Sequence, residues 1–177
     1  MNGILGAAGW RMPAAALLLC LIVGLLLVSR RRSVTLRVPA RLESIRPLAS
    51  LVERMGREAA LSEQAVFHCR LALDEACMNI IEHSYDDILD GQIEATIEVR
   101  KGSCAIFLTD FGKPYDPTRV SLPERDISLE NASPGGLGLY LMKNVMDEVR
   151  YEPSPGGNRL TMIKHSQPDS PSTIPFA

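Results

Sequence analysis

The apolar residues of this chain repeat with two different periods, and the order of these periods is the strongest limit on its fold. Between residues 34 and 38 apolar and polar positions alternate, which is typical of a strand, and this one ends at Pro39. From 42 to 60 the apolar residues return every three or four positions, and Ser62 is a suitable N-cap for a second helical segment that extends to about residue 85. The sequence therefore predicts one strand followed by two amphipathic helices.

Alternation returns in the second half of the chain. Segments 93–99 and 104–108 alternate around a Lys-Gly-Ser turn and predict a hairpin. Segment 135–147 opens with glycines and predicts a third helix, after which 149–152 and 160–164 flank a turn rich in Pro and Gly. Paired strands with separate helices predict an α+β two-layer sandwich, in which a mixed, mostly antiparallel sheet carries its helices on one face.

The chain of 177 residues is long enough for one domain with appendages. We expect an N-terminal segment at 1–33, a folded domain at 34–165 and a disordered tail, rich in Pro and Ser, at 166–177. Within the domain, segment 111–134 is polar, contains several prolines and has no clear period. Because it is longer than most loops of compact domains, we expect it to serve as a functional lid.

The N-terminal segment contains 17 uncharged, mostly aliphatic residues from Met12 to Val28, followed by arginines at 30–32. As a helix this run spans roughly 25 Å, near the lower limit for a hydrocarbon core of about 30 Å. Trp10 and the arginines favour a single-pass anchor in the inner membrane, with the domain in the cytoplasm. Two alternatives stay open: a cleaved signal peptide, and a mis-assigned start codon with a cytoplasmic protein.

Charge and cysteine content exclude several classes of function. The formal net charge is -2, and the first 33 residues contain four arginines but no acidic residue, so the rest of the chain is acidic. A chain with a negative net charge lacks the basic surface on which nucleic-acid binding depends.

The four cysteines form no Cys-x-x-Cys pair, which argues against a zinc site or a disulfide framework and favours a reducing compartment. Cys69 and Cys77 are interpreted as small core residues.

The first of three groups that could carry chemistry lies in the second helical segment. Glu75 and Asn79 are four positions apart, so their side chains lie one turn apart on one face. The carboxylate could orient or deprotonate a hydroxyl, and the amide oxygen is a neutral ligand suited to Mg²⁺. Taken alone, two solvated side chains on an exposed face are the better explanation. His83 is interpreted as a cation near the C-terminus of the helix.

The second group lies where the predicted strand 104–108 runs into a loop. Asp110 could accept a hydrogen bond from an amine such as the exocyclic group of adenine, and Gly112 would let the backbone approach a flat ring. An Asx turn is the simpler alternative. The tripeptide Asp-Phe-Gly also occurs in protein kinases, but the H-R-D, V-A-I-K and A-P-E segments of that fold are absent from the sequence.

The third group consists of Gly135, Gly136 and Gly138, which lead into the third predicted helix. Backbone N–H groups beside the positive end of a helix dipole can hold phosphates. The sequence has neither a Walker A loop nor the complete G-x-G-x-x-G pattern, so the glycines alone are weak evidence.

The three groups together are far more specific than each alone. Their order, Glu-x-x-x-Asn, Asp-x-Gly and Gly-Gly-x-Gly-Leu, resembles that of the GHKL ATPases with their Bergerat nucleotide-binding fold. More closely, Glu-Ala-x-x-Asn-x-x-x-His-x-Tyr at 75–85, Asp-x-Gly-x-Pro-x-Asp-Pro at 110–117 and Gly-x-Gly-Leu-x-Leu-Met at 136–142 are similar to the bacterial anti-sigma-factor serine/threonine kinases. The resemblance covers almost all of segment 34–165.

This resemblance implies a role for each candidate residue. Asn79 would bind Mg²⁺, which bridges the phosphates of ATP, and Glu75 would act as the catalytic base. Asp110, assisted by Gly112, would hold the adenine amine. The phosphates would be held by the glycine-rich segment, here Gly135, Gly136, Gly138 and Leu139.

The same resemblance implies an ATP-dependent kinase that phosphorylates a Ser or Thr of a small anti-anti-sigma partner. A sigma factor would compete with that partner, homodimerisation is implied by analogy, and the lid would respond to ATP versus ADP. Two alternatives stay open: a nucleotide-binding module that sequesters a partner without phosphoryl transfer, and the ATPase part of a sensor histidine kinase. For the second, the chain lacks room for the phospho-accepting helical hairpin.

Overall fold

The folded part of the chain is described by a computed structural model. The described residues are 13, 16, 31–85, 90–119, 136–154 and 156–166. By its internal contacts the chain divides into two units, Met1–Arg30 and Arg31–Ala177, and nearly all described residues belong to the second. Most of the expected lid (120–134) and of the expected tail (167–177) lie outside the described residues, so both expectations stay predictions.

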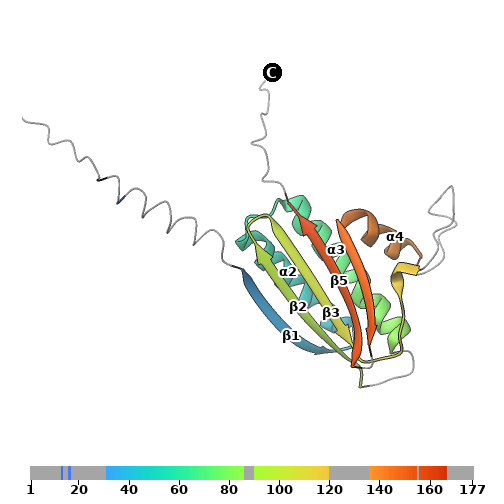
Figure 1. Cartoon of the computed structure of the whole chain (residues 1–177). Helices are drawn as coiled ribbons and strands as arrows, with labels where there is room; N and C mark the ends of the chain where they lie inside the picture. The colour runs from blue at the N-terminus through green and yellow to red at the C-terminus, as the bar shows by residue number, and fades with distance from the viewer. Residues whose placement is uncertain are drawn as a thin grey trace, which may run out of the picture. The chain divides into compact units, whose positions relative to one another are not determined.

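Five strands form one sheet in the order β1-β2-β3-β5-β4, and all neighbours are antiparallel. The strands are β1 (Arg32–Pro39), β2 (Gln92–Arg100), β3 (Ser103–Asp110), β4 (Glu148–Ser154) and β5 (Gly157–His165). The pairs β2–β3 and β4–β5 are the two predicted hairpins. Because β5 pairs with β3 as well as with β4, the last strand lies inside the sheet, and its beginning adjoins the end of β3 (Figure 1).

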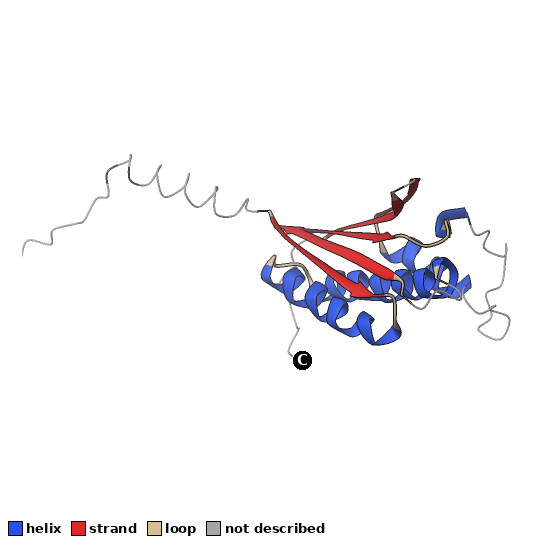
Figure 2. Ribbon diagram, turned by 90° about the horizontal axis from the view of Figure 1, so that it is seen from below, coloured by secondary structure: helices blue, strands red, loops and turns tan. Residues whose placement is uncertain are grey.

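Within the described part of the chain, helices cover one face of this sheet (Figure 2). They are α2 (Ile45–Glu58), α3 (Glu63–Asn79) and α4 (Gly136–Val145), and short 3-10 turns occur at Leu42–Ser44 and Pro117–Arg119. The predicted α+β two-layer sandwich with helices on one face is therefore confirmed, and the sheet is antiparallel throughout the described residues.

The end of α3 differs from the prediction. The helix begins as expected, because the Ser62 hydroxyl accepts a hydrogen bond from the backbone N–H of Ala65 at 3.2 Å. Its α-helical part ends at Asn79, and the chain continues as a π-helical turn, Ile80–Ser84. A π turn inserts a residue without ending the helix, so the spacing of apolar residues does not reveal it.

The core lies between the sheet and the helices, with α3 at its centre. Buried side chains on α3 face the sheet, α2 and α4, and they include Cys69 and Cys77, as predicted. The largest fully enclosed core side chains are contributed by both layers: Leu48, Leu73, Ile93, Ile97, Ile106, Leu108, Met142 and Met162. This packing fixes α3 against the sheet and thereby fixes the motif residues that α3 carries.

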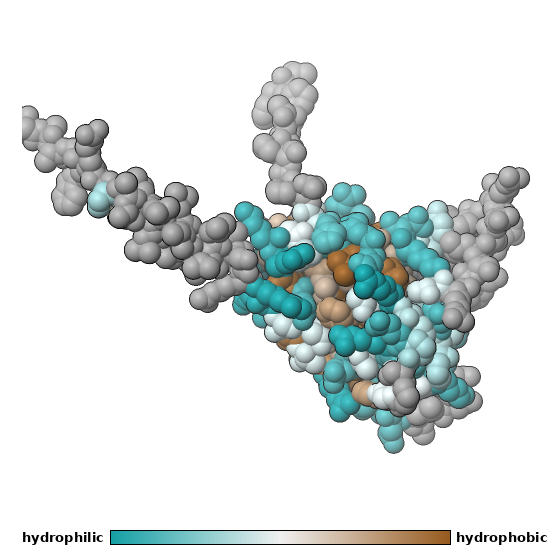
Figure 3. Space-filling view, in the orientation of Figure 1, coloured by the Kyte–Doolittle hydropathy of each residue, from teal (hydrophilic) through white to brown (hydrophobic). Residues whose placement is uncertain are grey.

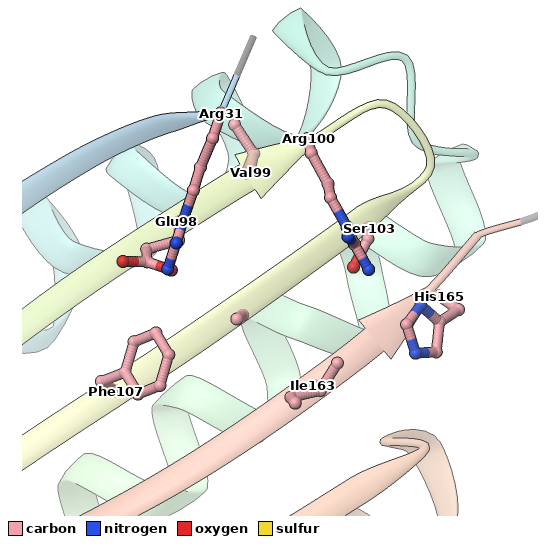
Figure 4. Close-up of a pocket in the computed structure, with 9 residues that line it drawn as sticks. Arg31, Glu98, Val99, Arg100, Ser103, Phe107, Ile163 and His165 are labelled. Carbon is pink, nitrogen blue, oxygen red and sulfur yellow. The ribbon is translucent and has the colours of Figure 1, made fainter. Parts of the chain in front are cut away.

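The other face of the sheet carries no helix among the described residues (Figure 2). Figure 3 shows apolar areas between hydrophilic side chains on the domain surface. A hollow of about 440 Å³ on the strands is lined by Arg31, Glu98, Phe107 and Ile163, among others (Figure 4). Arg31 pairs with Glu98, and the Arg159 guanidinium lies 4.8 Å from the centre of the Phe107 ring. None of the motif residues lines this hollow.

The expected membrane anchor and inner-membrane location are corrected by the structure. Across the residues that it describes, no helix is long and apolar enough to cross a membrane. The apolar run Met12–Val28, near the lower length limit for a span, lies outside the described residues except for Pro13 and Ala16. Ser166, which was expected to belong to the tail, is described, and its hydroxyl accepts a hydrogen bond from the Ser62 N–H at 2.8 Å.

Candidate active site

The first and third motifs meet where α3 passes the beginning of α4. Glu75 is on the last turns of α3, and Gly138 is in the first turn of α4. A Cβ atom built at Gly138 would overlap the Glu75 carboxylate. A glycine therefore allows the backbone of α4 to touch the candidate base, which any larger residue would displace.

The electrostatic environment of Glu75 suits a proton acceptor. Burial raises the pKa of Glu75, and the negative charges of Asp74 and Glu82 raise it further. A carboxylate with a raised pKa accepts a proton more readily than an ordinary Glu does. Glu75 also lines a groove of about 640 Å³ between α2 and α3, so it can be approached from outside the domain.

Asn79 lies one turn further along α3 and is 6% exposed. Its Nδ2 atom is buried and has no hydrogen-bond partner among the described residues. A buried polar atom of this kind costs free energy unless a water or a ligand satisfies it. Because the amide oxygen and nitrogen of Asn are exchanged by a flip of the side chain, the same position can also offer an oxygen to a cation.

Asp110, the last residue of β3, is 4% exposed and lines the same narrow cavity as Asn79. Burial raises the pKa of Asp110, while hydrogen bonds from Asn158, Gly112 and Ser84 act in the opposite direction. The cavity has a volume of about 10 Å³, which is about the size of one water probe. A flat ring can enter only if a wall moves, and Tyr115 forms one of these walls.

The backbone at Gly112 folds tightly against the π turn at the end of α3. A Cβ atom built at Gly112 would overlap the Ser84 carbonyl oxygen, and the N–H of Lys113 donates to that oxygen at 2.9 Å. The Gly112 N–H donates to Asp110 Oδ1 at 3.0 Å, which forms the Asx turn considered from the sequence. Gly112 thus permits a close approach to Ser84, whereas the sequence had suggested an approach to a flat ring.

Asn158 was not identified by the sequence, which assigned it to the turn of the last hairpin. It is the second residue of β5 and is 2% exposed. Its Nδ2 donates to Asp110 Oδ1 at 3.0 Å and lies 3.2 Å and 3.3 Å from the carbonyl oxygens of Gly112 and Lys113. The sequence contains no signal for this role, because the contact depends on β5 lying beside β3.

The other described candidate residues lie at the beginning of α4 and in the π turn after α3. Gly136 is the first residue of α4, and Leu139 lies in the same helix. Gly135 lies outside the described residues. His83, interpreted as a helix-end cation, is in the π turn, and its ring lies 4.1 Å from the ring of Tyr115, centre to centre.

Known proteins are similar to this chain in sequence and in fold. A family profile described as the histidine kinase-like ATPase domain matches residues 38–164. The chain belongs to this family. Its curated relatives include the serine/threonine-protein kinase BtrW of Bordetella bronchiseptica, 36% identical over 104 residues, which cover 59% of this chain and 73% of the relative. The serine-protein kinase RsbW of Bacillus subtilis is 25% identical over 139 residues, which cover 75% of this chain and 84% of RsbW.

Solved structures agree with this family assignment at the level of the fold. The structure of the RsbU and RsbW domains of a Mycobacterium tuberculosis protein matches with a TM-score of 0.54 at 16% identity. The match covers 76% of this chain and 32% of that longer protein. The resemblance to the GHKL ATPases, and within them to the anti-sigma-factor serine kinases, is therefore confirmed, as is the Bergerat fold.

Proposed function

We propose that this chain is an ATP-dependent protein serine/threonine kinase and anti-sigma regulatory factor. Its substrate is a Ser or Thr of a small anti-anti-sigma protein, and a sigma factor competes for the same kinase. The observation that carries this proposal is the convergence of the three motifs: Asn79 and Asp110 line one cavity, and Glu75, one turn away on α3, touches Gly138 of α4.

The adenine end of the nucleotide is assigned to Asp110. Its carboxylate is anchored through Oδ1 by Gly112 and Asn158, so it presents a fixed acceptor to an exocyclic amine. This anchoring supports recognition of adenine rather than of a base that carries a carbonyl group at that position.

The phosphate end is assigned to Asn79 and the glycines. Among the described residues the buried Nδ2 of Asn79 has no hydrogen-bond partner, which fits a phosphate-bound water or, after a flip of the amide, a cation at its oxygen. Asn79 would offer Mg²⁺ its amide oxygen, which is a hard and neutral ligand. When bound, Mg²⁺ would neutralise charge on the phosphates.

Glu75 is assigned the role of the general base that accepts the proton of the substrate hydroxyl. The hydroxyl oxygen attacks the terminal phosphorus of ATP, the bond from that phosphorus to the bridging oxygen breaks, and the proton passes to the Glu75 carboxylate. The raised pKa of Glu75 and its position beside an open groove support this role. The contact with Gly138 keeps the carboxylate near the segment expected to hold the phosphates.

The test uses labelled ATP, Mg²⁺ and, as candidate substrate, a small anti-anti-sigma protein with a phosphorylatable Ser. We expect label on the partner, and a fall in rate of about 10² to 10⁴ for Glu75→Gln with ATP still bound, as for loss of a general base. Glu63→Gln, at the exposed beginning of the same helix, is the matched control and should leave the rate unchanged. Tight ATP binding without any label on the partner would instead indicate a module that only sequesters it.

A further inference from the structure

The ladder between β2 and β3 ends in an unusual way at the adenine side of the site. Its last residue pair is Ile93 with Asp110. The next residues, Gln92 and Phe111, are joined through the hydroxyl of Tyr85. The Phe111 N–H donates to this hydroxyl at 2.8 Å, and the hydroxyl donates to the Gln92 carbonyl oxygen at 2.6 Å. One side-chain oxygen therefore connects the two strands where β3 leaves the sheet.

Tyr85 is itself held firmly. Its backbone N–H donates to the Ile80 carbonyl oxygen at 3.2 Å, which ties it to the π turn, and the residue is 7% exposed. A Cβ atom built at Gly91 would lie 2.6 Å from the Tyr85 ring, so the backbone before β2 packs directly on the ring. The hydroxyl thus has a fixed position relative to both the π turn and the sheet.

This position determines where the loop after Asp110 begins. The hydroxyl separates Phe111 from Gln92, so β3 stops pairing at Asp110 and turns toward Ser84 through Gly112. Phe111 lies between Asp110 and Gly112, so the place where the turn starts sets the position of the Gly112 N–H, which donates to Asp110 Oδ1. Tyr85 does not line the cavity shared by Asn79 and Asp110, so it acts through the loop.

We propose that Tyr85 is a positioning residue for recognition of the nucleotide base: its hydroxyl sets the backbone of Phe111 and thereby the direction of the Asp110 carboxylate. This inference rests on the proposed function, because it assumes that Asp110 accepts the adenine amine. It adds a specificity determinant that does not line the cavity shared by Asn79 and Asp110.

The test measures binding of ATP and of inosine triphosphate to the full chain by calorimetry. Inosine triphosphate carries a carbonyl group in place of the exocyclic amine, so it reports on the Asp110 contact. For Tyr85→Phe, which removes only the hydroxyl, we expect ATP affinity to fall roughly three- to tenfold, as for one lost hydrogen bond, and inosine triphosphate affinity to change less than twofold. The ratio of ATP affinity to inosine triphosphate affinity therefore decreases. A general loss of stability would lower both affinities and leave this ratio unchanged.

Two further variants serve as a second test of Tyr85 and as a control for lost stability. Gly91→Ala keeps the Tyr85 hydroxyl but displaces the ring and with it the position of the hydroxyl. It should therefore reduce the preference for ATP over inosine triphosphate in the same way, and it carries the test if Tyr85→Phe does not fold. Ser62→Ala removes a hydroxyl that caps the far end of α3 and should lower stability while leaving the preference unchanged.

The outcomes separate this inference from the proposed function. A wild-type chain that prefers ATP, with variants at Tyr85 and Gly91 that keep the full preference, overturns the role of Tyr85 alone. A wild-type chain that binds both nucleotides equally overturns the adenine assignment of Asp110 and this inference together. Absence of ATP binding by the wild-type chain overturns the proposed function as well.

Discussion

Asp110 is a buried carboxylate whose neighbours offset only part of its desolvation. Its pKa is raised by burial, although Asn158, Gly112 and Ser84 donate to it. A carboxyl group with a raised pKa in the folded state binds its proton more tightly there than in the unfolded chain, where the pKa is about 3.9. Its contribution to stability is therefore present in full below that value and is lost as the pH rises through the folded value. Stability therefore falls as the pH rises through the folded-state pKa of Asp110.

Replacing Asp110 by Asn should separate stability from binding. We expect the free energy of unfolding of Asp110→Asn at pH 7 to equal or exceed that of the wild type, because an uncharged amide is buried at less cost. ATP affinity should fall by about 10- to 100-fold, as for loss of a hydrogen bond to a charged group. Urea unfolding and calorimetry measure the two effects, with the exposed Asp90→Asn as control. Unchanged ATP affinity would contradict the placement of adenine.

Glu75 provides a prediction about pH. A base must be ionised to accept a proton, and burial raises the pKa of Glu75. The rate of phosphoryl transfer should therefore fall on the acid side with a midpoint above the ordinary Glu value of about 4.3. The measurement is kcat against pH at saturating ATP, and the Glu63→Gln variant should show the wild-type profile. An acid limb centred at or below the ordinary value would exclude Glu75 as the base.

At the scale of secondary-structure elements, the decisive contact is the one between α3 and α4. Glu75 extends from α3 into the space that a side chain at Gly138 would fill. Gly138 at the beginning of α4 thus makes room for the candidate base, beside the segment that is proposed to hold phosphate. The π turn at Ile80–Ser84 also joins two elements of the site. The carbonyl oxygen of its last residue, Ser84, accepts a hydrogen bond from the Lys113 N–H and so anchors the loop that follows Asp110.

The variant Gly138→Ala tests this contact. The added methyl group must displace either α4 or the Glu75 carboxylate, and a small misplacement of a catalytic group lowers the rate strongly. We expect phosphoryl transfer to fall by about 10- to 100-fold while circular dichroism retains the helical signal. Gly156→Ala is the matched control, because a Cβ atom there meets nothing within 4 Å. Equal rates for the two variants would show that the contact does not matter for catalysis.

At the scale of the whole molecule, the strand order brings distant parts of the chain together. Because β5 lies next to β3, Asn158 reaches Asp110 across 48 positions of sequence. The site therefore includes the central helix, the middle hairpin and the last hairpin. A ligand bound there contacts elements from both halves of the domain, which couples its binding to global stability.

Nucleotide should accordingly stabilise the domain as one unit. With Mg²⁺ and ATP at about 100 times Kd, the free energy of unfolding should rise by about 2.7 kcal/mol in a single transition. Thermal unfolding followed by circular dichroism measures this rise, and Asp110→Asn at the same ATP concentration should show a smaller one. Two separate transitions, or no rise at saturating ATP, would contradict a site shared by the whole domain.

Local patterns in the sequence predicted most of the fold. The strands of both hairpins, the two central helices and the Ser62 cap occur where the hydrophobic periods and the capping chemistry place them. The motif residues Glu75, Asn79, Asp110 and Gly138 are also recognisable from the spacing of the motifs alone. Local rules succeed here because helix and strand periods, caps and turns depend on residues that are close in sequence.

The amino-acid sequence by itself determined the α+β class and the order of the elements, and it identified the candidate residues for nucleotide binding. Only the tertiary structure decided that Asn158 and Tyr85 hold the loop after Asp110, that Gly138 makes room for Glu75, and that α3 ends in a π turn. The physical reason is that these contacts join residues far apart in the chain. They form through strand order and helix packing, which the period of a single segment does not encode.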